Sequence, residues 1–223
     1  VVAAAVSRGL AGLECLSGIP GSAGGTPVQN VGAYGQEIAQ TISEVTVLDR
    51  RTGDVTTLSG ADCRFAYRMS RFKREDAGRF IVCEVLLELS PGPPTVTYPD
   101  VVSHLERRGV VSPSLADVRE AVLSVRRGKG MVIDPSDADT RSVGSFFMNP
   151  VVDADRHARL ASAGRGPAPG FVLPGGKVKI PAAWLIEQSG FARGYQSGAV
   201  GLSSKHPLAI INRGAATARD VLA

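Results

Sequence analysis

The chain has 223 residues, of which 43% are hydrophobic and 21% charged, as in globular proteins with one large domain or two small ones. No run approaches the roughly twenty apolar residues that cross a bilayer, and the opening residues lack a basic leader, so we expect neither a membrane segment nor a signal peptide. The net charge of +4 suits anionic ligands, but only 5% of residues are aromatic and none is interleaved with a basic run. We therefore expect no nucleic-acid partner.

Cysteine and histidine are few and scattered. They are Cys15, Cys63, Cys83, His104, His157 and His206. No C-x-x-C pair occurs, which argues against a disulfide framework and against a metal site. This pattern favours a reducing compartment, and we expect a cytoplasmic protein without a metal.

The two ends of the chain suggest a piece of a longer protein. The sequence has no initial Met and begins within a stretch that reads as helical. Near the other end, Thr217 with Asp220 three positions later predicts the N-cap of another helix.

In chain order, the first predicted element is a loop. Seven glycines and two prolines between residues 12 and 35 leave no space for an element of normal length, so we predict an extended, turn-rich loop. Residues 44–49 and 55–58 are β-type runs around a polar turn and predict a hairpin. Residues 79–89 alternate and predict a strand. The alternation is expected to place Ile81, Cys83, Val85, Leu87 and Leu89 on one face of that strand.

After a proline loop at 91–94, Ser114 is expected to cap a helix. Its apolar residues at helical spacing are Leu115, Val118, Val122 and Val125. The composition changes after residues 126–130, which we interpret as a domain boundary. A helix near 181–188 and a buried strand at 208–211 follow. Strands and helices mix without regular alternation, which favours an α+β fold.

The glycine-rich loop is the segment that best predicts chemistry. Glycines at this density let backbone amides approach a ligand and form a concave nest for an anion such as a diphosphate. The spacing matches neither the P-loop nor the Rossmann fingerprint. Read without further context, a purely structural loop is equally compatible with the pattern.

Several blocks of the sequence form a recognisable series: 18–25 (GIPGSAGG), 29–37 (QNVGAYGQE), 65–73 (FAYRMSRFK), 144–150 (GSFFMNP), 183–191 (AWLIEQSGF), 204–208 (SKHPL) and 212–217 (NRGAAT). In this order, the blocks resemble those of the UDP-N-acetylenolpyruvoylglucosamine reductase family, in its tyrosine-loop type. The resemblance covers nearly the whole chain.

The resemblance implies an FAD-binding domain of the vanillyl-alcohol-oxidase type, without its N-terminal lobe, followed by a small α+β substrate-binding domain. We expect residues 1–129 to form the first and residues 130–223 the second. It also implies FAD and NADPH as cofactors and a UDP-sugar enolpyruvyl substrate that is reduced to UDP-N-acetylmuramate for the cell wall. We further expect a monomer.

The resemblance assigns roles residue by residue. Ser145 would be the serine that protonates the substrate, and Arg68 the arginine that binds its carboxylate, to which a planar guanidinium is suited. Cofactor-binding residues would be Gly18, Ile19, Pro20, Gly21, Ser22, Gly24, Gly25, Asn30, Gly32, Ala33, Tyr34 and Tyr67. Substrate-binding residues would be Tyr98, Arg126, Lys129, Asn149, Lys205 and His206.

Plainer readings of these residues remain open. Taken without the resemblance, Ser145 is a turn serine before a buried Phe pair, Arg68 a salt-bridged residue, Tyr98 a packed strand-end aromatic, and Arg126 part of a solvated basic helix end.

The match has departures. The family's Gly-x-Gly-Ser-Asn phosphate loop has no counterpart here, its catalytic glutamate would lie beyond residue 223, and Met148 stands where a polar residue is common. We therefore expect the fragment to be inactive alone. One alternative is a flavin or nucleotide-sugar binding module without turnover. Another, an unrelated oxidase of the same flavin superfamily, is disfavoured because it would lack the Ser145 block.

Overall fold

A computed structural model describes residues 1–162 and 167–223, the side chains of residues 161 and 162 excepted. The chain divides into two compact units, Val1–Arg127 and Gly128–Ala223. Within the described residues, no helix combines the length and apolar character that crossing a membrane requires.

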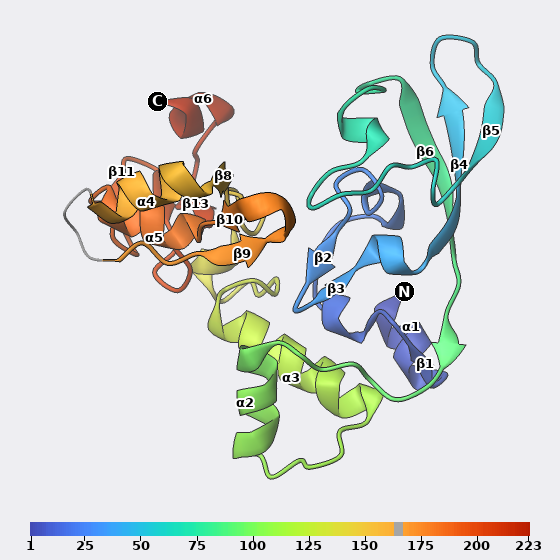
Figure 1. Ribbon diagram of the computed structural model, residues 1–223, viewed down its shortest axis with the longest axis horizontal. Coiled ribbons are helices and arrows are strands. Elements are labelled where there is room, and N and C mark those ends of the chain that lie inside the picture. Colours follow the sequence, from blue (N-terminus) through green and yellow to red (C-terminus); the bar gives the residue numbers. More distant parts are fainter. Residues whose placement is uncertain (163–166) are drawn as a thin grey trace. The chain divides into compact units, whose positions relative to one another are not determined.

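The first unit is built on a three-stranded antiparallel sheet of order β5-β4-β6, drawn in light blue to green in Figure 1. Its other strands form two short pairs, β1 with β7 and β2 with β3. The strands are β1 Leu10–Ala11, β2 Gly32–Ala33, β3 Gln36–Glu37, β4 Ile42–Asp49, β5 Val55–Ser59, β6 Phe80–Leu87 and β7 Ser90–Pro91. The helices are α1 Val2–Ser7, α2 Pro99–Arg107 and α3 Leu115–Gly128, with short 3-10 turns η1 Glu14–Leu16, η2 Ala23–Gly25, η3 Ile38–Gln40 and η4 Arg71–Lys73.

The hairpin and the third strand agree with the sequence, but the predicted face of β6 is wrong in its first half. The pairing register of β4 with β6 shifts between Thr46 and Val47, which oppose Glu84 and Val82. This shift leaves one extra residue on β6. Because a single inserted residue inverts the alternation, the inward residues before the bulge are the opposite set. Ile81 is 50% exposed and Cys83 is exposed. The core contacts of this segment come from Phe80, Val82, Val85, Leu87 and Leu89.

A second core lies where α2 and α3 pack together, the two helices drawn in green to yellow-green in Figure 1. Its buried residues are Cys15, Val101, Leu105, Val118, Ala121 and Val122. The predicted cap of α3 is confirmed, because the Ser114 hydroxyl accepts a hydrogen bond from the Asp117 amide while Asp117 accepts from Ser114. The sequence reading did not identify α2, which begins with Pro99 directly after Tyr98.

The second unit contains two small antiparallel sheets, of orders β8-β10-β9 and β11-β12-β13. The strands are β8 Val151–Asp153, β9 Phe171–Leu173, β10 Lys177–Lys179, β11 Gln196–Ser197, β12 Val200–Leu202 and β13 Ile210–Asn212. The helices are α4 Ala154–Ser162, α5 Ala182–Gln188 and α6 Ala218–Leu222, with 3-10 turns η5 Ala138–Thr140 and η6 Pro174–Gly176. The predicted helix near 181–188 and the Thr217 cap are present, and the predicted strand at 208–211 is formed two residues later.

Candidate functional site

The glycine-rich loop folds as predicted, without an element longer than three residues. Gly21 has a φ of +114°, a conformation that residues with side chains rarely adopt, and it leads into η2, where Ala23 and Gly25 are exposed. Ser22 Oγ accepts the amide of Gly25 at 3.2 Å. Among the described residues, no protein acceptor takes the amides of residues 21–24. The loop therefore presents consecutive free N–H groups, a donor set that fits the diphosphate of a dinucleotide.

Asn30 holds the second half of the loop from inside. It is 1% exposed, with a left-handed backbone at a φ of +47°. Its side-chain amide donates to Glu37 Oε2 at 2.7 Å and to the Ala66 carbonyl at 3.1 Å, while its oxygen accepts from the Ala39 amide at 3.1 Å. These bonds use both amide protons, so the side chain of Asn30 supports the loop. Its backbone amide donates to the Pro27 carbonyl at 3.4 Å and its carbonyl accepts from Arg68, so its predicted role toward a cofactor stays a prediction.

Arg68 clamps the same loop. Its guanidinium donates to the carbonyls of Asn30 and Gly32 and lies 3.6 Å from Glu37 Oε1. A Cβ on Gly32 would lie 2.8 Å from Arg68 Nη1, so this glycine is needed for the close approach. Arg68 also has a left-handed backbone, at a φ of +53°. The salt-bridged reading of Arg68 thus describes its position here, and its predicted role toward a substrate carboxylate stays a prediction.

Two tyrosines predicted to bind cofactor flank this clamp. The Tyr67 ring lies 5.2 Å from the Arg68 guanidinium carbon, and the Tyr34 ring packs against Tyr98. Tyr98 is 41% exposed at the start of α2. Its location beside Tyr34 agrees with a residue that borders the cofactor loop.

Arg126 lies beneath the loop and not at a solvated helix end. It is 7% exposed, and its Nη2 lies 3.4 Å from the Gly18 carbonyl. Burial lowers the pKa of Arg126, and a hydrogen bond with Tyr34 opposes that effect. This buried guanidinium brings positive charge to Gly18, in the first half of the glycine-rich loop, and favours an anion bound there.

Ser145 is the central residue of the second unit's candidate site. It follows Gly144, whose φ is +78°, and pairs by an isolated β-bridge with Ala209. The next amide, of Phe146, donates to the Leu208 carbonyl at 2.8 Å. Ser145 itself is exposed, and its Oγ lies 3.2 Å from His206 Nε2. Two residues predicted to bind or act on a substrate are therefore brought into contact.

The loop that carries His206 is held by a buried acidic residue that the sequence reading missed. Asp139, 3% exposed, accepts from the Ser203 hydroxyl at 3.0 Å and from the Ser204 amide and hydroxyl at 2.9 and 2.6 Å. Arg213 Nη1 lies 2.8 Å from its other oxygen. Burial works against ionisation of Asp139, but the hydrogen bonds from Ser204 and Ser203 and the charge of Arg213 outweigh it and lower the pKa of Asp139.

The remaining predicted residues of this unit are engaged differently. Lys205 donates to Asp137 at 2.6 Å, which raises the pKa of Lys205 through that hydrogen bond. Asn149 Oδ1 accepts the Ala182 amide at 2.9 Å and so caps α5. Lys129 is half-buried and lies near enough to affect the titration of His206. Each of these polar heads has a partner in the fold, so their roles toward a substrate stay predictions.

The aromatic pair after Ser145 is not a buried core element. Phe146 is 51% and Phe147 37% exposed, with ring centroids 5.3 Å apart. The reading of Ser145 as a turn residue before a buried Phe pair is therefore wrong. Met148 is equally exposed, at 51%.

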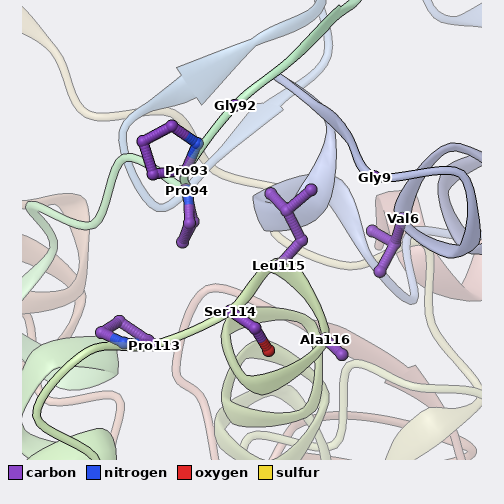
Figure 2. Close-up of a pocket in the computed structure, with 9 residues that line it drawn as sticks. All are labelled: Val6, Gly9, Gly92, Pro93, Pro94, Pro113, Ser114, Leu115 and Ala116. Atoms are coloured by element: carbon purple, nitrogen blue, oxygen red, sulfur yellow. The ribbon is translucent and has the colours of Figure 1, made fainter.

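The pockets of the first unit lie away from most of these groups. Figure 2 shows one of about 350 Å³, formed by Val6, Gly9, the irregular segment 92–94 and the start of α3. Its lining is backbone, proline and aliphatic carbon, apart from the Ser114 hydroxyl that caps α3. A second, of about 420 Å³, includes Gly35 and Glu14. Neither contains a residue predicted to be catalytic.

Glu37 and Asp139 are the residues that sequence reasoning missed. Glu37 ends the QNVGAYGQE block, and its carboxylate joins Asn30 to Arg68. Its location in the block was the available signal. Asp139 lies in an Asp/Ser/Gly-rich stretch that reads as a loop, so no local pattern marks it as buried.

Comparison with protein families agrees with this geometry. Residues 1–59 match the family described as FAD binding domain, and residues 134–223 match UDP-N-acetylenolpyruvoylglucosamine reductase, C-terminal domain. Together with the free amides of residues 21–24, these matches define a segment of an FAD-binding flavoprotein. The chain belongs to the UDP-N-acetylenolpyruvoylglucosamine reductase family, and the expected α+β fold with an FAD-binding domain is confirmed.

Similar proteins match the whole chain. Reductases of this name from Thermobifida fusca and Streptomyces coelicolor are 52% and 50% identical over 100% of this chain, which covers 64% and 60% of their lengths. That from Mycobacterium tuberculosis is 50% identical, with 63% of its length covered. A crystal structure of the reductase from Thermus caldophilus aligns over 99% of this chain and 60% of that one, with a TM-score of 0.63 and 26% identity. The chain thus spans less than two thirds of the curated relatives it matches.

Proposed function

We propose that the intact protein is an NADPH-dependent flavoprotein reductase. Its substrate would be UDP-N-acetyl-3-O-(1-carboxyvinyl)-glucosamine and its product UDP-N-acetylmuramate, for peptidoglycan synthesis. Identity of about 50% to reductases of that name supports the assignment. The observation that carries it is the exposed Ser145 hydroxyl, held on a backbone bridged to the chain beside β13.

The cofactor assignment rests on the glycine-rich loop. The amides of residues 21–24 would hold the FAD diphosphate. Bound FAD supplies a site that accepts hydride from NADPH and delivers it to C3 of the enolpyruvyl group. Gly18, Gly32 and the neighbouring loop residues would give the flavin its close backbone contacts.

Ser145 would complete the reaction. Hydride addition at C3 leaves an electron pair at C2, and the Oγ–H bond of Ser145 breaks as its proton moves to that carbon. The resulting alkoxide regains a proton from water, to which this exposed residue has access. Arg68 would bind the substrate carboxylate, while Tyr98, Arg126, Lys129, Asn149, Lys205 and His206 would contact the nucleotide sugar.

Further assignments belong to the same proposal. We place an FAD-binding domain at residues 1–129 and a substrate domain at 130–223, close to the division between compact units. We also propose a cytoplasmic monomer that binds no nucleic acid. The free cysteines, two buried and one exposed, support a reducing compartment.

The test separates the two half-reactions in the intact enzyme. Ser145→Ala should leave reduction of the flavin by NADPH almost unchanged and slow its reoxidation by the enolpyruvyl substrate by about 10²- to 10⁴-fold. Ser145→Cys should recover part of the rate, since a thiol also delivers a proton. Ser142→Ala is the matched control, because the Ser142 hydroxyl accepts only the Gly144 amide in the same turn.

The outcomes distinguish the candidate functions. If Ser145→Ala slows both half-reactions alike, the serine supports the fold and the proton-transfer role is wrong. If the unmodified intact protein binds flavin and the nucleotide sugar but transfers no hydride, it is the binding module.

A further inference from the structure

The Ser145 hydroxyl has one side-chain contact that the proposed chemistry does not yet use. Its Oγ lies 3.2 Å from Nε2 of His206, within hydrogen-bond range. The two residues are far apart in sequence and meet because the segment before β13 carries both the Ala209 bridge to Ser145 and the His206 ring.

The loop that carries His206 is fixed on several sides. Ser203 Oγ, itself a donor to Asp139, accepts the amide of His206 at 3.2 Å, and the His206 carbonyl accepts the Ala209 amide at 3.1 Å. Ser203 is fully buried and Asp139 nearly so. The imidazole therefore approaches Ser145 on a rigid segment rather than on a free loop end, which favours a defined hydrogen-bond geometry.

The surroundings keep this imidazole neutral. Burial, followed by the positive charges of Lys129 and Arg193, lowers the pKa of His206 to about 4. A neutral imidazole has one N–H, so Nε2 either donates to the serine oxygen or accepts the serine proton. The two tautomers have opposite consequences for a serine that must release its proton to a ligand. An accepting Nε2 would capture that proton.

We propose that His206 is a positioning residue for Ser145, whose Nε2–H donates to the serine Oγ. That bond occupies one lone pair of Oγ and leaves the hydroxyl proton directed away from the ring, toward the ligand. As the proton moves to substrate carbon, the same N–H stabilises the oxygen that becomes negative. His206 keeps its own proton throughout, and water reprotonates the serine. The kinetic part of this inference rests on the proposed function, whereas the hydrogen bond and its tautomer do not.

The first experiment needs no activity. Nitrogen NMR of the protein reports which imidazole nitrogen carries hydrogen, and His206→Gln identifies the His206 signals by removing them. At pH 7 the expected spectrum shows a neutral ring protonated at Nε2. A bare Nε2, or a doubly protonated ring, overturns the proposal whether or not the protein is a reductase.

The second experiment uses the intact enzyme with reduced flavin and the enolpyruvyl substrate. His206→Phe should lower kcat of reoxidation by about 10- to 100-fold, the range for loss of a hydrogen bond to a charged group, with a smaller change in KM. His206→Gln should restore most of the rate, since its amide nitrogen can donate at similar reach.

Three kinetic results would overturn the positioning role. If kcat of reoxidation is no higher for His206→Gln than for His206→Phe, a hydrogen-bond donor at this position is not needed. A higher KM with unchanged kcat would make His206 a nucleotide contact only. Equal slowing of flavin reduction by NADPH would indicate a structural role. If unmodified enzyme performs neither half-reaction, the proposed function fails, and the NMR result decides this inference separately.

Discussion

The ring of Tyr98 meets the ring of Tyr34 edge to face, with centroids 5.1 Å apart and planes at 88°. Tyr34 has a left-handed backbone, at a φ of +51°, and its phenol shares a hydrogen bond with the buried Arg126. Tyr98, which precedes α2, is therefore linked through Tyr34 to Arg126, and Arg126 contacts the glycine-rich loop at Gly18. A ligand that displaces Tyr98 would act on a contact of the cofactor loop.

This relationship separates two roles of Tyr98. Tyr98→Phe keeps the edge contact, so it should leave the free energy of unfolding nearly unchanged while raising KM for the UDP-sugar substrate. Tyr98→Ala should raise KM as well and lower stability by about 0.5–1.5 kcal/mol, the value of such a ring pair. Urea unfolding and the kinetics of each half-reaction measure both effects. Equal slowing of flavin reduction and reoxidation would mean that Tyr98 is only structural.

Gly32 should be intolerant of a methyl group. In Gly32→Ala the new Cβ would meet Arg68 Nη1, the Gln36 carbonyl and Glu37 Cγ, each at 2.8 Å. Overpacking of this kind costs about 1–3 kcal/mol and should push the guanidinium off the loop.

Gly25→Ala is the matched control for Gly32→Ala. The nearest atom to its Cβ is Ser22 Oγ at 3.5 Å, an ordinary contact, so stability should change by less than about 0.5 kcal/mol. Urea unfolding of both variants checks the difference. Equal stability would show that Arg68 adjusts freely and does not clamp the loop.

Local features of the fold could be predicted from sequence because neighbouring residues determine them. Ser114 and Asp117, like Thr217 and Asp220, form capping boxes from residues three apart. The β4–β5 hairpin likewise depends on its own turn and alternation. The motif blocks located Ser145 and the cofactor loop for the same reason: each is a continuous segment.

Features set by distant contacts could not be predicted. The bulge in β6 depends on its pairing with β4, and the burial of Asp139 depends on Ser203, Ser204 and Arg213, more than sixty positions later. Local composition marks Asp139 as a loop residue. The contact of Ser145 with His206 also spans the unit, so the sequence named both residues without showing that they meet.

The hydrogen bond between Asn30 and Glu37 can be tested through the pH dependence of stability. Asn30→Asp would place a carboxylate beside Glu37 Oε2, which now accepts a hydrogen bond at 2.7 Å. Two adjacent carboxylates disfavour ionisation, so the pKa of the introduced carboxyl should rise in the folded state. The variant should lose about 1–3 kcal/mol at pH 7.

The sign of the pH effect follows from that raised pKa. The destabilisation caused by the charge of the introduced carboxylate is complete above the folded-state pKa of that group. It disappears as the pH falls below the unfolded-state pKa of about 4, so the stability of Asn30→Asp relative to wild type should recover on acidification. Asn30→Ala, which loses the same hydrogen bonds without adding charge, should show a constant deficit. Parallel pH curves for the two variants would contradict the carboxylate pair.

Asp139 should stabilise the folded protein mainly through its negative charge. Asp139→Asn leaves Arg213 beside a neutral group and removes an acceptor from the Ser203 and Ser204 donors, so we expect a loss of about 3–5 kcal/mol at pH 7. Because the pKa of Asp139 is lowered in the folded state, its contribution is present above the unfolded value near 3.9 and is lost as the pH falls through the folded pKa. The difference between wild type and variant, measured by urea unfolding, should therefore narrow at pH 3.

The control for Asp139 lies two residues away. Asp137 pairs with Lys205 at 2.6 Å, but the two side chains are 22% and 38% exposed, so Asp137→Asn should cost no more than about 1 kcal/mol. Only Asp139→Asn should also loosen the Ser203–His206 loop and thereby slow the reoxidation half-reaction that depends on Ser145. If the two variants are equally stable, the buried carboxylate does not anchor the loop. If Asp139→Asn is unstable yet reoxidises flavin at the normal rate, the loop's rigidity is unnecessary for the serine.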